Sequence, residues 1–169
     1  MITPEFVRLM ARYNRWQNQS LYGAADTLTD DQRKQDRGAF FGSIHGTLNH
    51  LMFGDGIWMS RFTGDASFKP IATGIPGSPN AFPDWQILVV ARAALDERII
   101  DWADRVTPAD LAGDLTWFSG LAKAERTRPR ALLIVHMFNH QTHHRGQTHC
   151  MLTAAGAKPD DTDLMVMPA

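Results

Sequence analysis

The chain of 169 residues has a single cysteine, Cys150, and almost no net charge. One thiol excludes an internal disulfide and a zinc site built from four cysteines, and it is typical of a protein from a reducing compartment. The formal charge of −1, from 17 basic and 18 acidic residues, gives no electrostatic footprint for nucleic acid or an anionic membrane. We therefore expect neither a nucleic-acid partner nor a membrane partner.

Long apolar runs and internal repeats are also missing from the sequence. Residues 1–16 are amphipathic and interrupted by charge, so they predict neither a signal peptide nor a membrane span. With 44% hydrophobic residues and a length typical of one domain, the chain is expected to form a single domain over residues 1–169. These features together favour a cytoplasmic protein.

Four segments carry apolar residues at helical spacing, and their ends have capping signals. Thr3 and Asp84 can cap the first and third segments, and Gly64 and Gly156 can end the second and fourth. The helices are expected to cover residues 3–24, 43–64, 84–107 and 127–156. Such helices favour an all-α, up-and-down four-helix bundle, a fold that commonly builds metal sites from facing helices.

The connections differ in character. Residues 30–41 are polar and read as a plain connection. Residues 66–83 carry glycines and prolines at positions 74, 76, 77, 79 and 83, among others, which favours a long structured loop that could overhang a site. Polar and apolar residues alternate on both sides of Gly120, predicting a small β-hairpin between the third and fourth helices. The apolar carboxyl-terminal residues 163–169 are expected to pack across the bundle or against a partner.

Five of the seven histidines lie between His136 and His149 on the fourth expected helix. Side chains four residues apart share one helix face, so two imidazoles at that spacing can bind one metal ion. The pairs His136/His140 and His140/His144 both have this spacing. Because buried imidazoles need a hydrogen bond or a metal, the cluster predicts a metal site.

The orientation of the other histidines follows from the choice of inward face. If Leu132 faces the core, the inward stripe continues through positions 136, 139 or 140, 143 or 144, 147, 151 and 154. His143 points about 100° away from His144, so it is expected at the surface or in a hydrogen bond. His45 and His149 lack a matched partner and are expected to be ordinary packing or surface residues.

A third ligand is needed, because catalytic metal sites generally have three protein ligands and an open position. His50 on the second helix is the best-placed candidate and Asp55 the next. Asp55 falls on the apolar register of its helix, so we expect its side chain to be buried and paired with another polar side chain. It could also accept a hydrogen bond from one of the metal-binding residues. Gln141 stands where a zinc protease needs a glutamate base, which argues against peptide hydrolysis.

Two segments together carry a family signature: Thr47-Leu-Asn-His50-Leu with Asp55 and Trp58, and Phe138-Asn-His140-Gln-Thr-His143-His144-Arg145-Gly146-Gln147. With them the chain resembles, over nearly its whole length, the DinB/YfiT-like family of metal-dependent bacterial proteins. The resemblance implies a four-helix bundle with its metal on one histidine of the second helix and two of the fourth. By motif these are His50, His140 and His144. The resemblance further implies zinc or a nickel-like divalent ion, and a homodimer.

The same resemblance implies an enzyme that uses a low-molecular-weight thiol, either transferring it to an electrophile or isomerising a double bond, as maleylpyruvate isomerase does. A metal-bound thiol loses its proton near neutral pH, and the thiolate is the nucleophile. We expect a small-molecule substrate in a pocket walled by the first and third helices and the 66–83 loop. Arg145 is expected to pair with a substrate or thiol carboxylate, or to form a surface or dimer-interface ion pair. His136 and His143 are further candidates for contact with a ligand or substrate.

Two other functions use the same three-ligand site. One is a hydrolase that employs metal-bound hydroxide. The other is a non-catalytic, stress-associated metal-binding protein in which the ion fixes the core of the bundle.

Overall fold

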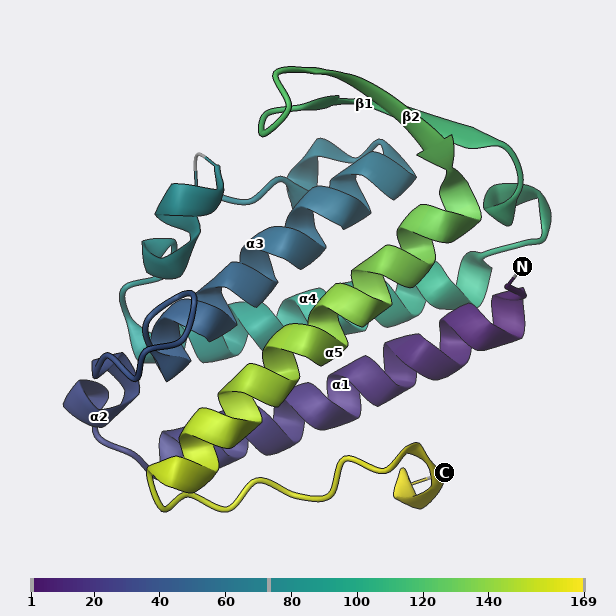
Figure 1. Cartoon of the computed structure of the whole chain (residues 1–169). Coiled ribbons are helices and arrows are strands. Elements are labelled where there is room, and N and C mark those ends of the chain that lie inside the picture. The colour runs from purple at the N-terminus through teal and green to yellow at the C-terminus, as the bar shows by residue number, and fades with distance from the viewer. Residues whose placement is uncertain (1, 73, 169) are drawn as a thin grey trace.

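The computed structural model describes residues 2–72 and 74–168, and this part of the chain is mostly helical (Figure 1). The α-helices are α1 (Pro4–Asp26), α2 (Asp30–Lys34), α3 (Ile44–Thr63), α4 (Trp85–Arg105) and α5 (Arg130–Ala154). Short 3-10 helices are η1 (Ala66–Phe68), η2 (Ile75–Asn80), η3 (Ala109–Leu111) and η4 (Leu164–Val166). Strands β1 (Asp114–Ser119) and β2 (Ala124–Pro129) complete the fold.

The ends of the long helices follow the capping signals of the sequence. The side chain of Thr3 accepts a hydrogen bond from the backbone of Phe6, and Asp84 caps α4 in the same way. Gly64 and Gly156 have left-handed backbone angles just after α3 and α5. The boundaries predicted for the four long helices are therefore confirmed to within a few residues.

The four long helices pack side by side, with α1 against α4 and α5, and α3 against α5 and α4 (Figure 1). Helices α3 and α4 run in the same direction, because His45 lies near Trp85 at their starts and Phe62 stacks on Trp102 near their ends. The simple up-and-down order is therefore wrong for this pair. The physical reason is the long connection over residues 64–84, which returns the chain to the start of α3 before α4 begins.

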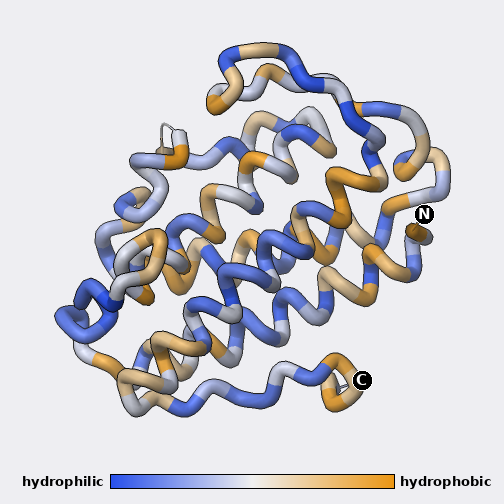
Figure 2. The backbone as a smooth tube through the Cα atoms, viewed as in Figure 1, coloured by the Kyte–Doolittle hydropathy of each residue, from blue (hydrophilic) through white to orange (hydrophobic). Residues whose placement is uncertain are grey.

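Apolar side chains from all four long helices form one core. Ile44 and Leu48 of α3, Ile99 of α4 and Met137 of α5 are fully buried. Hydrophobic and hydrophilic residues alternate along each helix, as the coloured tube shows (Figure 2). Helices α1, α4 and α5 each bury one face, whereas residues 44–56 of α3 are buried on every side. The burial of apolar side chains is the main driving force for this packing.

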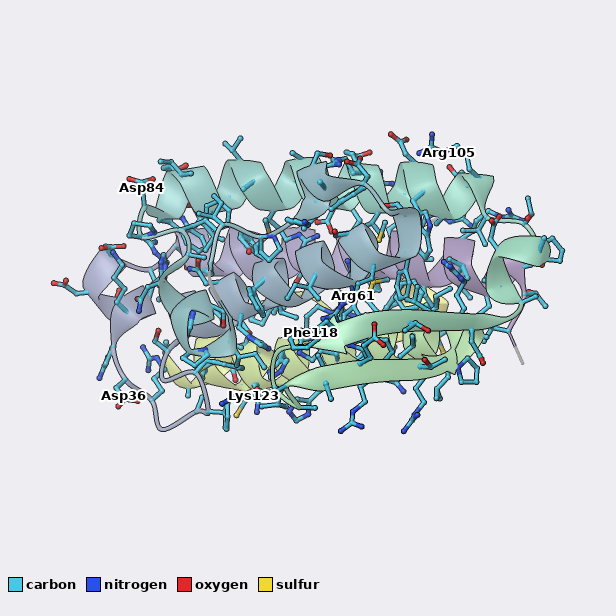
Figure 3. The ribbon with its side chains drawn as sticks, turned by 90° about the horizontal axis from the view of Figure 1, so that it is seen from above. Asp36, Arg61, Asp84, Arg105, Phe118 and Lys123 are labelled. Carbon is cyan, nitrogen blue, oxygen red and sulfur yellow. The ribbon has the colours of Figure 1, made fainter. Side chains whose placement is uncertain are left out.

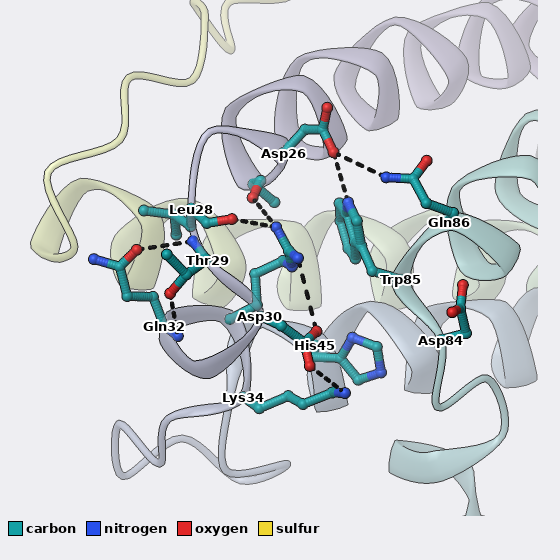
Figure 4. Close-up of polar contacts among 12 residues, drawn as sticks. Asp26, Leu28, Thr29, Asp30, Gln32, Lys34, His45, Asp84, Trp85 and Gln86 are labelled. Carbon is teal, nitrogen blue, oxygen red and sulfur yellow. Dashed lines mark hydrogen bonds and ion pairs between the residues drawn. The ribbon is translucent and has the colours of Figure 1, made fainter.

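The stretch expected as a plain connection, residues 30–41, instead contains the short helix α2. Thr29 and Gln32 form a capping box at its start (Figure 4). Arg33 is buried, donates to the carbonyl of Leu28, and lies over the ring of Trp85. This anchoring stabilises a single helical turn too short for a periodicity argument to detect.

The 66–83 connection is mostly irregular, as expected, but includes the two 3-10 helices η1 and η2. Helix η2 packs against α3 and brings Ser78 to its side chains. The predicted hairpin is confirmed, because β1 and β2 pair antiparallel with Thr116 opposite Thr127. It lies over the end of α3 and leads into the start of α5 (Figures 1 and 3).

The carboxyl-terminal segment runs along α1 (Figure 1). Tyr13 and Gln17 donate to the carbonyls of Thr162 and Asp161, which lie just before the apolar segment 163–169, so the packing expected of that segment stays a prediction. Residues 164–166 expose their apolar side chains, and residue 169 of the predicted segment lies outside the described residues. Among the described helices, none has both the length and the hydropathy needed to cross a membrane.

Candidate metal centre

Three histidines from two facing helices converge at one point. His50 is on α3, and His140 and His144 are one turn apart on α5. One ring nitrogen from each lies within 4.8 Å of the other two. The Nε2 atoms of His50 and His140 are 3.0 Å apart. The structure thus brings together the three residues chosen from the sequence, and favours His140/His144 over His136/His140.

Hydrogen bonds fix the orientation of two of these rings. The hydroxyl of Ser78 donates to the carbonyl of Ile75, so its oxygen accepts from the Nδ1–H of His50 at 3.0 Å. The Nδ1–H of His144 donates to the Oε1 of Gln147 at 2.7 Å. With both Nδ1 atoms protonated, the Nε2 lone pairs of His50 and His144 are free to bind a cation.

The third ring, His140, is positioned by a glycine. A Cβ added to Gly54 of α3 would stand 2.8 Å from Cε1 of His140, a distance that real Cβ atoms do not adopt. The absence of a side chain at Gly54 is therefore what lets the imidazole lie against α3. Within the described residues, the buried Nδ1 atom of His140 has no hydrogen-bond partner.

The donor set fits a transition metal. Two imidazole lone pairs facing each other at 3.0 Å repel unless a proton or a cation lies between them. Three imidazole nitrogens about 2.0–2.1 Å from one tetrahedral Zn²⁺ lie roughly 3.3 Å from one another. The spacing here, from 3.0 Å to at most 4.8 Å, brackets that value. The three residues could therefore hold a divalent metal ion.

The electrostatics keep these imidazoles neutral. Burial, with the neighbouring His140 and His144, lowers the pKa of His50 from 6.5 to about 3. Burial and His144 lower the pKa of His140 to about 4, and burial also lowers the pKa of His144. Neutral imidazole is the form that binds metal, so the site is ready for an ion at neutral pH.

An aromatic side chain covers one side of the cluster. Phe41, from the loop before α3, stacks on His50 with ring centroids 3.7 Å apart. The same ring meets His144 edge-on at 5.3 Å. The neighbouring walls therefore come from this loop, α3, α5 and η2. Of the walls expected from the sequence, the 66–83 connection is present through η2, whereas α1 and α4 make none of these contacts. The reason is that α1 and α4 pack on the opposite side of α3 and α5.

Asp55, the alternative third ligand, lies outside the histidine cluster. It is fully buried, forms a 2.7 Å ion pair with Arg92, and accepts a 2.9 Å hydrogen bond from Gln141. The expectation that it is buried and paired is confirmed. Its contacts are with Arg92 and Gln141, so it supports the site through the core and does not hold a ligand ring directly.

Two other histidines of α5 stay outside the cluster. His136 is exposed, with its ring 6.0 Å from that of His140 and edge-on to Trp58 at 5.2 Å. His143 is exposed, as expected, and its ring lies 4.8 Å from that of His144. Neither belongs to the group of three ring nitrogens that lie within 4.8 Å of one another.

The surface interpretation of Arg145 is wrong. Only 5% of the residue is exposed, and its guanidinium contacts Asn14 and lies over the ring of Tyr13, both on α1. One residue along the helix from His144 is enough to turn the side chain into the core. Arg145 therefore faces α1 and not the histidine cluster.

Arg145 belongs to a buried polar network, because its partner Asn14 also donates to Asp96 at 3.2 Å. The expectations from the sequence do not include this network. Arg92 bridges Asp55 and Asp96 at 2.7 and 2.8 Å, and Asn18 donates to Asp96 at 2.9 Å. Burial raises the pKa of Asp96 despite the neighbouring Arg92. The sequence does contain a signal for this network, because Arg92 and Asp96 fall at helical spacing among the buried leucines and isoleucine of α4.

The face of α5 that is buried also differs from the expected stripe. Leu132 is 43% exposed, while Leu133, Met137 and Gln141 are buried. The true core face is therefore turned by about one residue, or 100°, from the expected one. His140 lies at its edge and His144 within it, which directs both rings toward α3.

Comparison with known proteins identifies the family of the chain. The DinB family model matches residues 1–168. No curated protein and no solved structure matches the chain. Since the family model covers nearly the whole sequence, including all three clustered histidines, the chain belongs to the DinB family.

Proposed function

We propose that this DinB-family protein is a metal-dependent enzyme that acts with a low-molecular-weight thiol, as a transferase or an isomerase, on a small-molecule substrate. Its scaffold is a single four-helix-bundle domain. The observation that carries the proposal is the convergence of three neutral imidazoles, each with a nitrogen directed at a common point. Three protein ligands are the number that catalytic zinc sites use when one position stays open.

The residues around the centre favour thiol chemistry over hydrolysis. His50, His140 and His144 would hold zinc or a nickel-like ion, which supplies a positive charge that lowers the pKa of a bound thiol. Ser78 and Gln147 keep two of the rings in the binding tautomer. The nearest buried carboxylate, Asp55, is committed to Arg92 and Gln141, so it cannot serve as the base that hydrolysis needs.

The walls of the site suit an organic ligand. Phe41 presents a ring beside His50 and His144, and Trp58 presents one beside His136. Such rings exclude water and pack against apolar parts of a substrate. A low dielectric at this position strengthens the attraction between a metal ion and a thiolate.

The test combines metal content with thiol turnover. The purified protein, loaded with Zn²⁺ or Ni²⁺, is incubated with a panel of cellular thiols and a generic electrophile. We expect one metal ion per chain and saturable conjugation with at least one thiol. His140→Ala should lose both, and the control His143→Ala, which removes an exposed neighbour outside the cluster, should keep the metal.

Two results would contradict the proposal in different ways. Full metal content in His140→Ala would show that the ligands are assigned wrongly. One metal ion per chain without turnover with any thiol would favour a non-catalytic metal-binding protein instead.

A homodimer is part of the proposal. It is supported by the exposed apolar side chains of Leu164, Met165 and Val166 at the carboxyl-terminal end. Light scattering coupled to gel filtration should give twice the 18.9 kDa mass of one chain. Replacing Met165 by lysine should shift the protein toward the monomer, and a monomeric wild type would overturn this part.

A further inference from the structure

A row of rings leads from the histidine cluster along α3 and α5 to a cation. The ring of His136 lies 6.0 Å from that of His140, and the ring of Trp58 lies 5.2 Å from that of His136. The guanidinium carbon of Arg61 is 4.7 Å from the Trp58 ring. Two ring side chains thus connect the proposed metal centre to Arg61.

Arg61 is held between α3 and the hairpin, as seen from above in Figure 3. Its guanidinium also lies over Trp117 of β1, at 5.5 Å from the ring centroid. Both tryptophans are half-buried, and so is Arg61. The two rings fix the cation in place on the side of the helix that faces the hairpin.

Among the side chains of residues 2–72 and 74–168, no carboxylate forms an ion pair with Arg61. Arg98, which lies over Phe68 in a similar way, does pair with Asp65. A partly buried guanidinium with five donors gains most from a planar anion that accepts two hydrogen bonds. Arg61 is partly removed from water, and this burial lowers the pKa of its guanidinium.

We infer that Arg61 binds the carboxylate of a ligand whose thiol end lies at His50, His140 and His144. This inference rests on the proposed thiol function and adds a substrate class to it. Arg145, the carboxylate partner expected from the sequence, faces α1 on the other side of α5. Arg61 therefore replaces Arg145 as the residue that binds the carboxylate, and Trp58 packs against the middle of the ligand.

The spacing selects the length of the ligand. Arg61 follows His50 by eleven residues on α3, about 16 Å along the helix axis. Its side chain leans back toward the start of the helix and shortens that reach by a few ångströms. A thiol acid the size of a single amino acid is too short to join the two ends, whereas a tripeptide-sized thiol acid can do so.

The experiment uses the full chain loaded with Co²⁺, whose absorption gains a charge-transfer band when a thiolate binds. The long probe 11-mercaptoundecanoate is compared with 11-mercaptoundecanol, which differs only in lacking the carboxylate, and with the short 3-mercaptopropionate. In Arg61→Gln, the dissociation constant of the long acid should rise about 10-fold or more, because a charged hydrogen bond is lost. The alcohol and the short acid should bind as they do to the wild type.

Control variants separate this role from a structural one. Arg61→Lys should recover part of the affinity for the long acid, because it restores the charge without the planar fork. Arg98→Gln removes a cation of similar setting and should change none of the three affinities. Unchanged metal content in each variant shows that the centre is intact.

The outcomes are distinguishable. Equal binding of the long acid and the long alcohol to the wild type, or equal weakening of both in Arg61→Gln, would overturn the inference while leaving the thiol function standing. Failure of every thiol to change the Co²⁺ spectrum would overturn the proposed function, and the inference with it.

Discussion

Replacing Gly54 by alanine should weaken metal binding without unfolding the protein. The added Cβ would lie 2.8 Å from Cε1 and 3.2 Å from Nδ1 of His140. An ordinary contact begins at 3.4 Å, so the ring must move by several tenths of an ångström or rotate. Ligand distances must stay within about 0.2 Å of their ideal values, so such a shift disrupts coordination.

The magnitude follows from the geometry. Changes in residues that orient metal ligands typically cost about 10–100-fold in affinity, and we expect Gly54→Ala to fall in this range. The metal-free protein should instead gain stability from the substitution, because alanine in a helix interior is more favourable than glycine by roughly 0.5–1 kcal/mol. Part of this gain offsets the strain of moving His140.

The assay is a competition titration of Zn²⁺ against a chromophoric chelator, with thermal unfolding of the metal-free protein measured in parallel. Gly146→Ala is the matched control, since it lies on α5 near the site but has nothing within 4 Å of the added Cβ. That variant should keep the wild-type affinity. If Gly54→Ala bound Zn²⁺ as tightly as Gly146→Ala, His140 would not be a ligand in the position described.

Three further predictions concern the partners of the site. Ser78→Ala removes the acceptor for the Nδ1–H of His50 and should lower Zn²⁺ affinity about 10-fold or more in the same titration. The free energy of unfolding of the metal-free protein should fall as the pH drops below 6.5, because the folded pKa values of His50 and His140, about 3 and about 4, lie below 6.5 and the unfolded chain binds more protons. Urea titrations at pH 7.5 and pH 5 measure this loss, which continues until about pH 3, the lower of the two folded pKa values. Asp55→Ala leaves the buried Arg92 without its 2.7 Å partner and should cost about 3–5 kcal/mol in urea unfolding.

Each of these has a control and a contradicting result. Gln147→Glu keeps an acceptor for the Nδ1–H of His144. This variant should therefore bind Zn²⁺ at least as well as the wild type, unlike Ser78→Ala. A His50→Gln, His140→Asn double variant should lose much of the pH dependence, and an unchanged slope would contradict the assignment. Asp65→Ala, which removes an exposed partner of Arg98, should cost no more than about 1 kcal/mol, and a similar cost for both aspartates would refute the role of the buried network.

The clustered histidines could be found from the sequence because helical spacing alone places residues four apart on one face. Helical spacing could not decide between the pairs His136/His140 and His140/His144, because His140 belongs to both. The family resemblance gave the choice of His140/His144. The prediction of which face of α5 is buried was wrong for a different reason. Residues 131–135 are all apolar, so the start of the helix does not show which side is buried.

Other features depend on partners far away in the chain. Arg145 is buried because Asn14 and Tyr13 of α1 lie beside it, and nothing in its own helix indicates this contact. Ser78 and Phe41 reach the centre from irregular segments, where periodicity carries no information. Helices α3 and α4 run in the same direction because the 64–84 connection returns to the start of α3. The amino-acid composition of this connection does not predict its path.

The central claim is that three imidazoles hold one metal ion and leave a position for a thiol. X-ray absorption spectroscopy of the Zn²⁺-loaded protein, before and after addition of a thiol, tests it most directly. We expect three imidazole nitrogens at about 2.0–2.1 Å and, with thiol, one sulfur at about 2.3 Å. Fewer than three imidazoles, or a zinc environment that gains no sulfur from any thiol, would contradict this account.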